Sequence, residues 1–255
     1  TRQTLCSGTR QFSMGSFAMR PPDFGRLACY LTPTQICSYL PDQLSTTLFV
    51  DPTVQFDAVL YGQLANLGFR RSGKHIYRPH CKTCSECISV RIPVDKFRMS
   101  RSQKRIWHKN RDLITEIKQL EYSDEHFKLF RKYVHSRHKD GGMDNPTSES
   151  YMSFLANDNI ATNAIEFRLD QTLVAVAIYD KLPNGLSAVY TFYADDLGNR
   201  SLGTYALLRE IMGTKKQNLS WLFLGYWIKN CNKMSYKRNF NPLEGFVSNT
   251  WISLP

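Results

Sequence analysis

Residues 186–226 read LSAVYTFYADDLGNRSLGTYALLREIMGTKKQNLSWLFLGY, and the order of their patterns decides the expected fold. Segments 186–193 and 221–226 are rich in aromatic and aliphatic residues and have the length of strands. Residues 198–203 contain two glycines and predict a loop, and residues 204–212 predict a helix. We therefore expect a strand, a glycine loop, a helix and a second strand, in that order.

The loop before the predicted helix resembles a phosphate-binding loop. Residues 200–205 are similar to the R/Q-x-x-G-x-G/A loop of acetyltransferase-like (GNAT) folds, which binds a pyrophosphate at a helix N-terminus. Tyr205 replaces the last glycine, and its side chain would obstruct the close backbone approach that glycine permits. The resemblance implies an acetyltransferase-like fold in which coenzyme A is not the donor. A plain strand-to-helix turn explains the same residues about as well.

Periodic patterns on both sides of this segment predict further elements. Alternating apolar residues predict a strand over residues 87–94, and residues 164–169 and 172–180 also read as strands. Residues 54–66 predict a helix that Asp51 caps, and Ser100 is expected to cap a basic helix that ends near Asn110. Ser72-Gly73 predicts a hairpin within residues 69–77.

The expected fold class is therefore α+β, with an acetyltransferase-like catalytic domain and a smaller N-terminal α/β region that carries a Cys-rich loop. We expect residues 1–30 to be an upstream extension or a segment foreign to the natural protein, because they show no sustained period. The Cys-containing region is expected to span residues 31–112, and the acetyltransferase-like domain residues 113–255.

The net charge indicates the class of partner. The 255 residues carry a formal charge of +11, and 42% of them are hydrophobic. Such a chain can bury a core, and its excess of Lys and Arg favours a polyanionic partner such as nucleic acid or an anionic membrane surface. A basic protein without such a partner is the alternative. No apolar run approaches the roughly 18 to 20 residues of a membrane span, so we expect no membrane insertion.

The cysteines predict thiol or metal chemistry. Cys81, Cys84 and Cys87 have CxxCxxC spacing, and Cys37 is a candidate fourth ligand. Four thiolates suit a structural zinc ion or an iron–sulfur cluster, whereas core-facing or free thiols are the other interpretation. The total of seven cysteines is odd and the N-terminus shows no signal peptide, so we expect a reducing cytoplasm.

Two basic segments interleave aromatic residues with Lys and Arg. They are residues 70–105, around the cysteines, and residues 224–244, LGYWIKNCNKMSYKRNFNPLE. Aromatic rings can stack on unpaired bases while cations neutralise phosphates, which suits the single-stranded acceptor end of a tRNA. A core strand followed by a solvated loop is the alternative interpretation of the second segment.

Five segments resemble the arginyl-tRNA–protein transferase family, and look closest to its bacterial branch, the aspartate/glutamate leucyltransferases. These segments are CSYLPDQ from Cys37, GFRRSGKHIYRPHC from Gly68, SRSQKR from Ser100, SLGTYALLREI from Ser201 and LGYWIKNCNKMSYK from Leu224. The resemblance extends from residue 31 to the end of the chain.

The resemblance implies a transfer of leucine from Leu-tRNA to the α-amine of proteins that begin with Asp or Glu. The product is marked for degradation through its new N-terminal residue. Because the aminoacyl ester is already activated, the transfer requires no cofactor. Eukaryotic arginyl members have cysteines linked to an iron–sulfur cluster where this chain has Leu40 and Ser85, so that cluster is not carried over residue by residue.

Within this reaction we expect three groups of residues, since tyrosine can pass protons, Arg binds carboxylates bidentately and cations bind phosphates. The expected catalytic and leucyl-binding residues are Tyr190, Tyr193 and Tyr226. The expected acceptor-binding residues are Arg70, Arg71, Arg91, Ser102 and Gln103. The expected tRNA-binding residues are Arg105, Lys233, Tyr236 and Lys237.

Other functions fit parts of the same pattern. Arginyl transfer uses the same chemistry, and a non-catalytic, zinc-stapled RNA-binding module would use the same basic and aromatic residues. A small-molecule acetyltransferase is a third alternative, against which Tyr205 argues.

Overall fold

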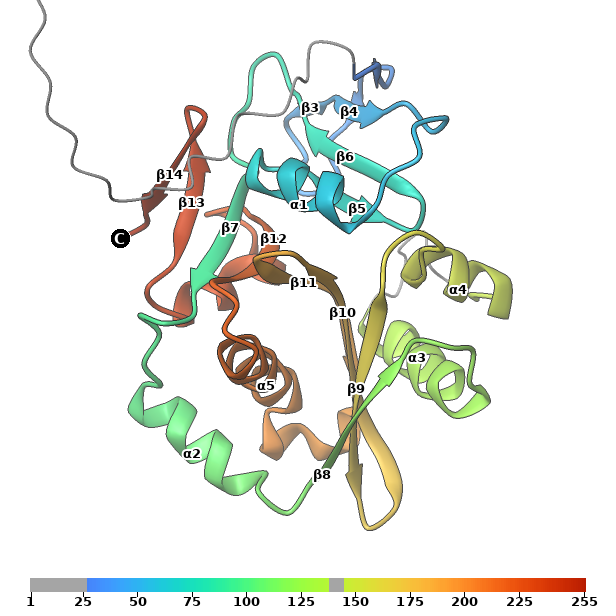
Figure 1. Ribbon diagram of the computed structural model, residues 1–255, viewed down its shortest axis with the longest axis vertical. Helices are drawn as coiled ribbons and strands as arrows, with labels where there is room; N and C mark the ends of the chain where they lie inside the picture. The colour runs from blue at the N-terminus through green and yellow to red at the C-terminus, as the bar shows by residue number, and fades with distance from the viewer. Residues whose placement is uncertain (1–26, 138–144) are drawn as a thin grey trace, which may run out of the picture.

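Figure 1 shows the computed structural model of the protein, which describes residues 27–137 and 145–255. Its centre is a sheet in which eight strands of the described residues pair side by side. Their order is β14 (Thr250–Ser253), β13 (Glu244–Val247), β7 (Ile88–Pro93), β12 (Trp221–Trp227), β11 (Gly185–Tyr193), β10 (Thr172–Leu182), β9 (Thr162–Leu169) and β8 (Ile114–Gln119). The fold is thus of the α+β class.

One pair of neighbours in this sheet, β11 and β12, is parallel. The chain between them forms a 3-10 helix, η2 (Asp195–Arg200), and α5 (Leu202–Lys216), which confirms the predicted strand, loop, helix and strand. The two strands pair only from Gly185↔Trp221 to Ser187↔Phe223. Beyond these positions β12 has a bulge and no longer pairs with β11, although both strands continue. We call this feature the β11–β12 divergence.

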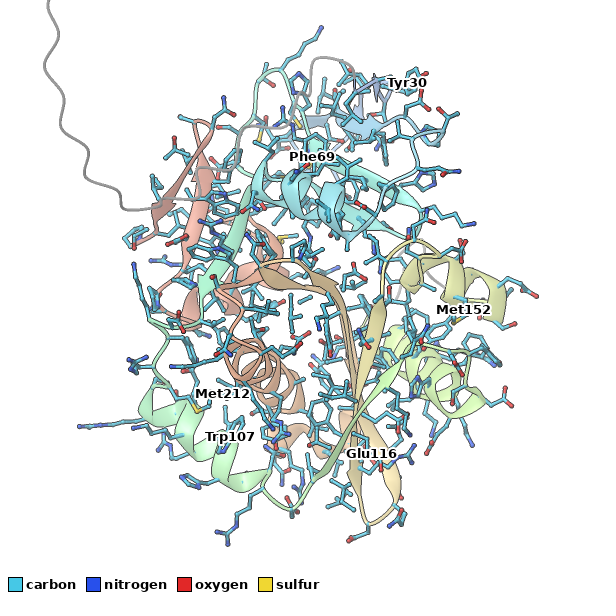
Figure 2. All side chains as sticks on the ribbon, viewed as in Figure 1. Tyr30, Phe69, Trp107, Glu116, Met152 and Met212 are labelled. Atoms are coloured by element: carbon cyan, nitrogen blue, oxygen red, sulfur yellow. The ribbon has the colours of Figure 1, made fainter. Side chains whose placement is uncertain are left out.

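Helices cover both faces of the central sheet (Figure 1). On one face lie α5 and α2 (Arg101–Lys109), and on the other α3 (Asp124–Arg137) and α4 (Ser148–Leu155). In Figure 2, Trp107 and Met212 accordingly lie on the opposite side of the sheet from Met152. Each face has its own apolar core. Strand β10 is buried along most of its length, and its side chains contribute to both cores.

The N-terminal part forms a smaller layer that packs on one end of the central sheet (Figure 1). Its sheet has the order β1 (Cys29–Leu31), β4 (Thr47–Val50), β6 (His75–Pro79) and β5 (Arg70–Ser72), and the predicted hairpin is β5–β6. A short separate pair joins β2 (Gln35–Ile36) to β3 (Leu44–Ser45). Helix α1 (Ala58–Asn66) packs with this layer against Phe223 and Leu182 of the central sheet.

The expected region boundaries need two adjustments. Strand β7 lies between β13 and β12, so residues assigned to the N-terminal region build part of the central sheet. The boundary near residue 112 therefore does not separate two sheets. Strand β1 begins at Cys29 and pairs with β4, which places the last residues of the expected extension in the fold. Residues 1–26 of that extension lie outside the described residues.

Local hydrogen bonds explain where the helices begin. Asp57 caps α1 by accepting from the Leu60 amide, and not Asp51 as expected, because the Asp51 carboxylate instead accepts from the amide and hydroxyl of Thr53. Ser100 caps α2 as predicted and forms a capping box with Gln103. None of the helices in residues 27–137 and 145–255 has the length and apolarity that crossing a bilayer requires.

A buried ion pair fastens the N-terminal layer to the central sheet. The Arg71 side chain on β5 donates to both oxygens of Asp180 on β10, each at 2.6 Å, and both side chains are fully buried. Arg71 also donates to the Leu155 carbonyl and to the Thr162 hydroxyl. Its other terminal nitrogen donates to the Gly73 carbonyl, so every nitrogen of the guanidinium is occupied within the protein.

We predict that Asp180→Asn lowers the free energy of unfolding by about 3 to 5 kcal/mol, because it leaves the Arg71 charge buried without a counterion. Urea unfolding measures this change. The matched control is Asp158→Asn, which breaks an ion pair with Lys74 whose side chains are 79% and 75% exposed, and it should change stability little. Equal effects of the two substitutions would contradict this account of the layer contact.

Candidate functional site

The β11–β12 divergence is bridged by the side chain of Arg70. This residue lies on β5 and is 8% exposed. One terminal nitrogen donates to the Ser187 hydroxyl at 3.2 Å and to the Phe223 carbonyl at 3.3 Å, and the other donates to the Ala188 carbonyl. Arg70 thus replaces part of the ladder that β12 no longer supplies to β11. Its Nε–H has no hydrogen-bond partner among the described residues.

Gly225 allows Arg70 to reach this position. It follows the bulge in β12 and has a φ of +78°, which favours glycine. A Cβ at this residue would lie 3.0 Å from the Nε of Arg70 and 3.2 Å from its Cζ. The guanidinium therefore lies directly against the backbone of β12.

Six ionisable side chains interact electrostatically with Arg70, and two of them, Tyr61 and Tyr77, belong to the N-terminal layer. We call the other four, together with Arg70, the Arg70 cluster: Arg70, Glu210, Tyr226, Tyr236 and Lys237. They come from β5, α5, β12 and η3 (Asn232–Asn239). Segments distant in the sequence therefore meet where β11 and β12 separate.

Lys237 is the buried cation of η3. Its Nζ donates to the Tyr226 carbonyl, and it is 7% exposed. Burial, with the positive charge of Arg70, lowers the pKa of Lys237 to about 7. Burial thus favours the neutral form of this amine. Buried as it is, Lys237 does not present a charge to tRNA phosphates, and we remove it from that predicted group.

Tyr226 has a structural role in the same cluster. Its hydroxyl lies 3.0 Å from the Gly68 carbonyl and 3.1 Å from the Tyr77 carbonyl, and its single proton is shared between these two acceptors. Burial raises its pKa. Because its proton is committed to backbone carbonyls that join β12 to the N-terminal layer, the expected proton transfer by Tyr226 is not supported.

Tyr190 and Tyr193 lie together on β11 against α3. Their rings are 6.3 Å and 5.0 Å from the ring of Tyr133. Burial raises the pKa of Tyr190 to about 12. Tyr193 also interacts electrostatically with Tyr236, so it adjoins the Arg70 cluster, while Tyr190 belongs to the aromatic core under α3 and α4.

The start of α5 corrects the expected role of Tyr205. Tyr205 is 2% exposed and packs into the core, with its ring 5.6 Å from Trp107 and 5.5 Å from Phe167. It therefore does not project over the glycine loop. Tyr193 does, since a Cβ on Gly203 would lie 2.9 Å from its ring.

Two predicted acceptor-binding arginines are engaged elsewhere. Arg71 is paired with Asp180, as described above. Arg91 lies between two indoles, 3.6 Å from the centre of the Trp221 ring and 4.1 Å from that of Trp251, and forms an ion pair with Glu244. Neither guanidinium is available to a substrate carboxylate, so of the predicted arginines only Arg70 stays in the proposed acceptor site.

The residues predicted on α2 and η3 divide into internal and surface positions. Gln103 is 4% exposed, caps α2 and donates to the Asn239 carbonyl, so it does not line an acceptor pocket. The Ser102 hydroxyl is exposed and bonded to Ser100. Arg105 and Lys233 are exposed on α2 and η3, and Tyr236 is 49% exposed. These last three stay as predicted tRNA contacts.

The four cysteines predicted to bind a metal, Cys37, Cys81, Cys84 and Cys87, lie in one region of the N-terminal layer. Burial, with the neighbouring Cys37, Cys81 and Cys84, raises the pKa of the Cys87 thiol to about 12. Residues 27–137 and 145–255 contain no group of three or more His, Cys, Asp or Glu side chains arranged to hold a metal ion. The geometry does not support the predicted zinc or cluster site, and we assign no metal to it.

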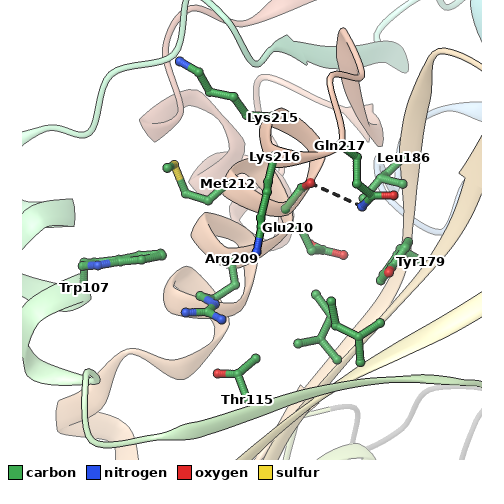
Figure 3. A pocket seen from close by; sticks show the side chains of 13 residues that line it. Trp107, Thr115, Tyr179, Leu186, Arg209, Glu210, Met212, Lys215, Lys216 and Gln217 are labelled. Carbon is green, nitrogen blue, oxygen red and sulfur yellow. Dashed lines mark hydrogen bonds between the residues drawn. The ribbon is translucent and has the colours of Figure 1, made fainter.

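A pocket of about 490 Å³ lies on the α5 side of the sheet (Figure 3). Its walls come from α2, α5 and strands β8 to β11. Glu210 of α5 lines it and is 1% exposed, and neither carboxylate oxygen has a hydrogen-bond partner among the described residues. Burial raises the pKa of Glu210 to about 8, although the charge of Arg70 opposes this shift.

Sequence reasoning did not select Glu210, although a signal for it exists. The residue lies in the stretch ALLREI, on the same helical stripe as Ala206 and Thr214. A carboxyl group on the apolar stripe of an amphipathic helix is costly to bury, and perturbed groups of this kind are frequent at functional sites.

Comparison with known proteins identifies relatives along most of the chain. Residues 35–105 match the family model described as "Arginine-tRNA-protein transferase, N terminus", and residues 125–247 match "Arginine-tRNA-protein transferase, C terminus". The chain is 46% identical to the aspartate/glutamate leucyltransferase of Hahella chejuensis, over 89% of this chain and 97% of that protein. It is 47% identical to that of Pseudomonas aeruginosa, over 91% of this chain and 99% of that protein.

Two solved structures share a weaker likeness. L-PGS from Bacillus licheniformis matches with a TM-score of 0.45 and 12% identity, covering 69% of this chain and 55% of that one. FemX matches with a TM-score of 0.44 and 10% identity, covering 69% of this chain and 61% of that one.

We predict that Glu210 makes stability depend on pH. Between about pH 4.5 and 8 the folded state retains the Glu210 proton that the unfolded state has released. The free energy of unfolding should therefore fall as the pH rises through this window, by at most about 1.4 kcal/mol per pH unit. Glu210→Gln should remove this component. Urea unfolding of both proteins across the window tests it, and parallel pH curves would contradict the prediction.

Proposed function

Since this chain belongs to the arginine-tRNA-protein transferase family, we propose that it transfers leucine from Leu-tRNA to the N-terminal amine of proteins that begin with Asp or Glu. The observation that carries this proposal is the identity of 46% over nearly the whole length of an aspartate/glutamate leucyltransferase. The transfer marks the acceptor for degradation through its new N-terminal residue.

The chemistry is an acyl transfer. The acceptor amine attacks the ester carbonyl of leucyl-tRNA, a C–N bond forms, the bond to the ribose oxygen breaks, and that oxygen takes up a proton. The ester is already activated, so positioning and proton movement are the main requirements for the protein. An α-amine has an ordinary pKa of about 7.7 to 8.0, so part of the acceptor is neutral at pH 7.

In our proposal Arg70 binds the carboxylate of the acceptor. Its charge is buried, and no carboxylate among the described residues forms an ion pair with it. The unpartnered Nε–H lies at the β11–β12 divergence. A carboxylate gains a charge-assisted hydrogen bond there, whereas an uncharged first residue leaves the guanidinium uncompensated.

Lys237 is proposed to receive the proton that the acceptor amine loses. Its neutral form is substantially populated at pH 7, and it belongs to the same cluster as Arg70. An amine with a pKa near the working pH suits general base catalysis. Tyr236 belongs to this cluster and Tyr193 adjoins it, and we propose that one of these two tyrosines supplies the proton for the ribose oxygen.

We further propose an acetyltransferase-like topology and a tRNA-binding face. A parallel strand pair that diverges beside a crossover helix supports the first, through β11, α5 and β12. The exposed cations of α2, which include Arg105, support the second, together with Lys233 and Tyr236 on η3. Their role is to bind the acceptor end of the tRNA.

The test supplies the purified protein with Leu-, Arg- or Phe-tRNA, each with peptides that begin with Asp, Glu, Lys or Ala. We expect leucine to be added to the Asp and Glu peptides. Arginine transfer without leucine transfer would replace the proposed donor, and failure with every donor and acceptor would remove the proposed function.

For Arg70→Met we predict a 10- to 100-fold loss of kcat/KM for an Asp peptide, about the value of a hydrogen bond to a charged group. The loss should lie in the KM for the peptide, with the KM for Leu-tRNA unchanged. The control is Arg131→Met, which removes one positive charge from an exposed position on α3 and should leave both KM values unchanged. An equal rise in both KM values would indicate a merely structural role for Arg70.

A further inference from the structure

The α5-side pocket has a chemistry that the proposed roles above do not use. Most of its wall is apolar, and the residues that form this wall are Trp107, Ile117, Ile165, Tyr179, Leu186 and Met212. Apolar walls exclude water and favour an aliphatic or aromatic ligand group. The volume of about 490 Å³ is large enough for an amino-acid side chain with its backbone atoms.

Glu210 gives the pocket one buried polar anchor. In Figure 3 its side chain extends from α5 toward the sheet, on the side of Tyr179. Both oxygens lack partners among the described residues, although an unpaired buried carboxyl group is costly. A ligand with a protonated amine would displace the Glu210 proton and pair with both oxygens of the resulting carboxylate.

The mouth of the pocket is cationic. Lys215 and Lys216 are exposed at the end of α5, and Arg209 is half-buried with its guanidinium 5.4 Å from the centre of the Trp107 ring. A ligand that enters here therefore combines an ammonium group, an apolar body and, outside the pocket, an anionic part. A leucyl group esterified to the terminal ribose of a tRNA has these three features.

We propose that this pocket holds the leucyl group of Leu-tRNA, with its α-ammonium on Glu210, its isobutyl side chain against Ile165 and Leu186, and the terminal phosphates at Lys215, Lys216 and Arg209. This assignment rests on the proposed function. It places the leucyl group on the α5 side of the sheet, and not beside Tyr190 on the α3 side.

Glu210 also belongs to the Arg70 cluster, because it interacts electrostatically with Arg70 and adds to the raised pKa of Tyr236. In this proposal the ester carbonyl that adjoins the leucyl ammonium faces the β11–β12 divergence, where the Arg70 side chain lies.

The same arrangement selects against arginine. One carboxylate compensates one cation, so an arginyl group with its ammonium on Glu210 leaves its guanidinium against Ile165 and Leu186. An uncompensated charge on such a surface is strongly unfavourable. The preference for leucine then arises from the absence of a second carboxylate among the residues that line the pocket.

The experiment uses the full chain and two neutral amides that differ by one group. L-Leucinamide has the ammonium and 4-methylpentanamide lacks it, and their dissociation constants are measured by calorimetry at about pH 7, where α-amines are largely protonated. We expect leucinamide to bind the wild-type protein at least about tenfold more tightly, because its ammonium forms a charged hydrogen-bonded pair with Glu210 and the Glu210 proton is released. Glu210→Gln should bind both amides within about twofold of each other.

A second variant tests the pocket without disturbing the anchor. Gly213 lies in α5 and lines the pocket, and a Cβ there meets no atom within 4 Å. Gly213→Leu should fold at least as well as the wild type, because leucine has a higher helix propensity than glycine. It should weaken the binding of leucinamide, because the added side chain fills the cavity. Glu149→Gln, an exposed change on α4, should leave both constants unchanged.

Transfer kinetics separate this inference from the proposed function. Glu210→Gln and Gly213→Leu should raise the KM for Leu-tRNA and leave the KM for the peptide unchanged. If the wild-type protein transfers leucine but neither variant alters leucinamide binding or the KM for Leu-tRNA, the pocket assignment is overturned and the function stands. If leucinamide binds selectively through Glu210 without any transfer, the proposed function fails while the site for an amine-bearing apolar ligand stands.

Discussion

The short pairing of β11 with β12 is the constraint on which the rest of the structure depends. Two parallel strands that share only three register positions leave backbone groups without ladder partners where they separate. Arg70 supplies hydrogen bonds to two of these carbonyls, and Gly225 provides the space for its guanidinium. A charged side chain is thereby fixed where the central sheet opens.

This constraint also explains why the N-terminal layer belongs to the site. Arg70 and Arg71 are neighbours on one short strand, yet they reach different strands of the central sheet. Arg70 bonds to β11 and β12, and Arg71 bonds to β10. Arg71 secures the layer through a buried ion pair, and Arg70 carries its charge to the divergence. The two arginines look alike in the sequence, yet one fastens the layer and the other is proposed to meet the substrate.

The sequence predicted the elements better than the roles of individual residues. Periodicity found β11, α5 and β12, and the capping residue Ser100 was identified because its signal is local. The partners of Arg71 and Arg91 lie about 110 and 150 positions away, so no local pattern reveals that Asp180 and Glu244 engage them. Glu210 was overlooked for the related reason that burial on one face of α5 depends on the packing of β8 to β11.

The central claim is that a leucyl ester and an acidic N-terminus meet at the Arg70 cluster. A crystal structure with a hydrolysis-resistant amide analogue, 3′-leucylamino-3′-deoxyadenosine, tests it most directly. Our account predicts the leucyl ammonium within about 3 Å of a Glu210 oxygen, with the acyl carbonyl facing the β11–β12 divergence. An analogue bound on the α3 side of the sheet, beside Tyr190, would contradict it.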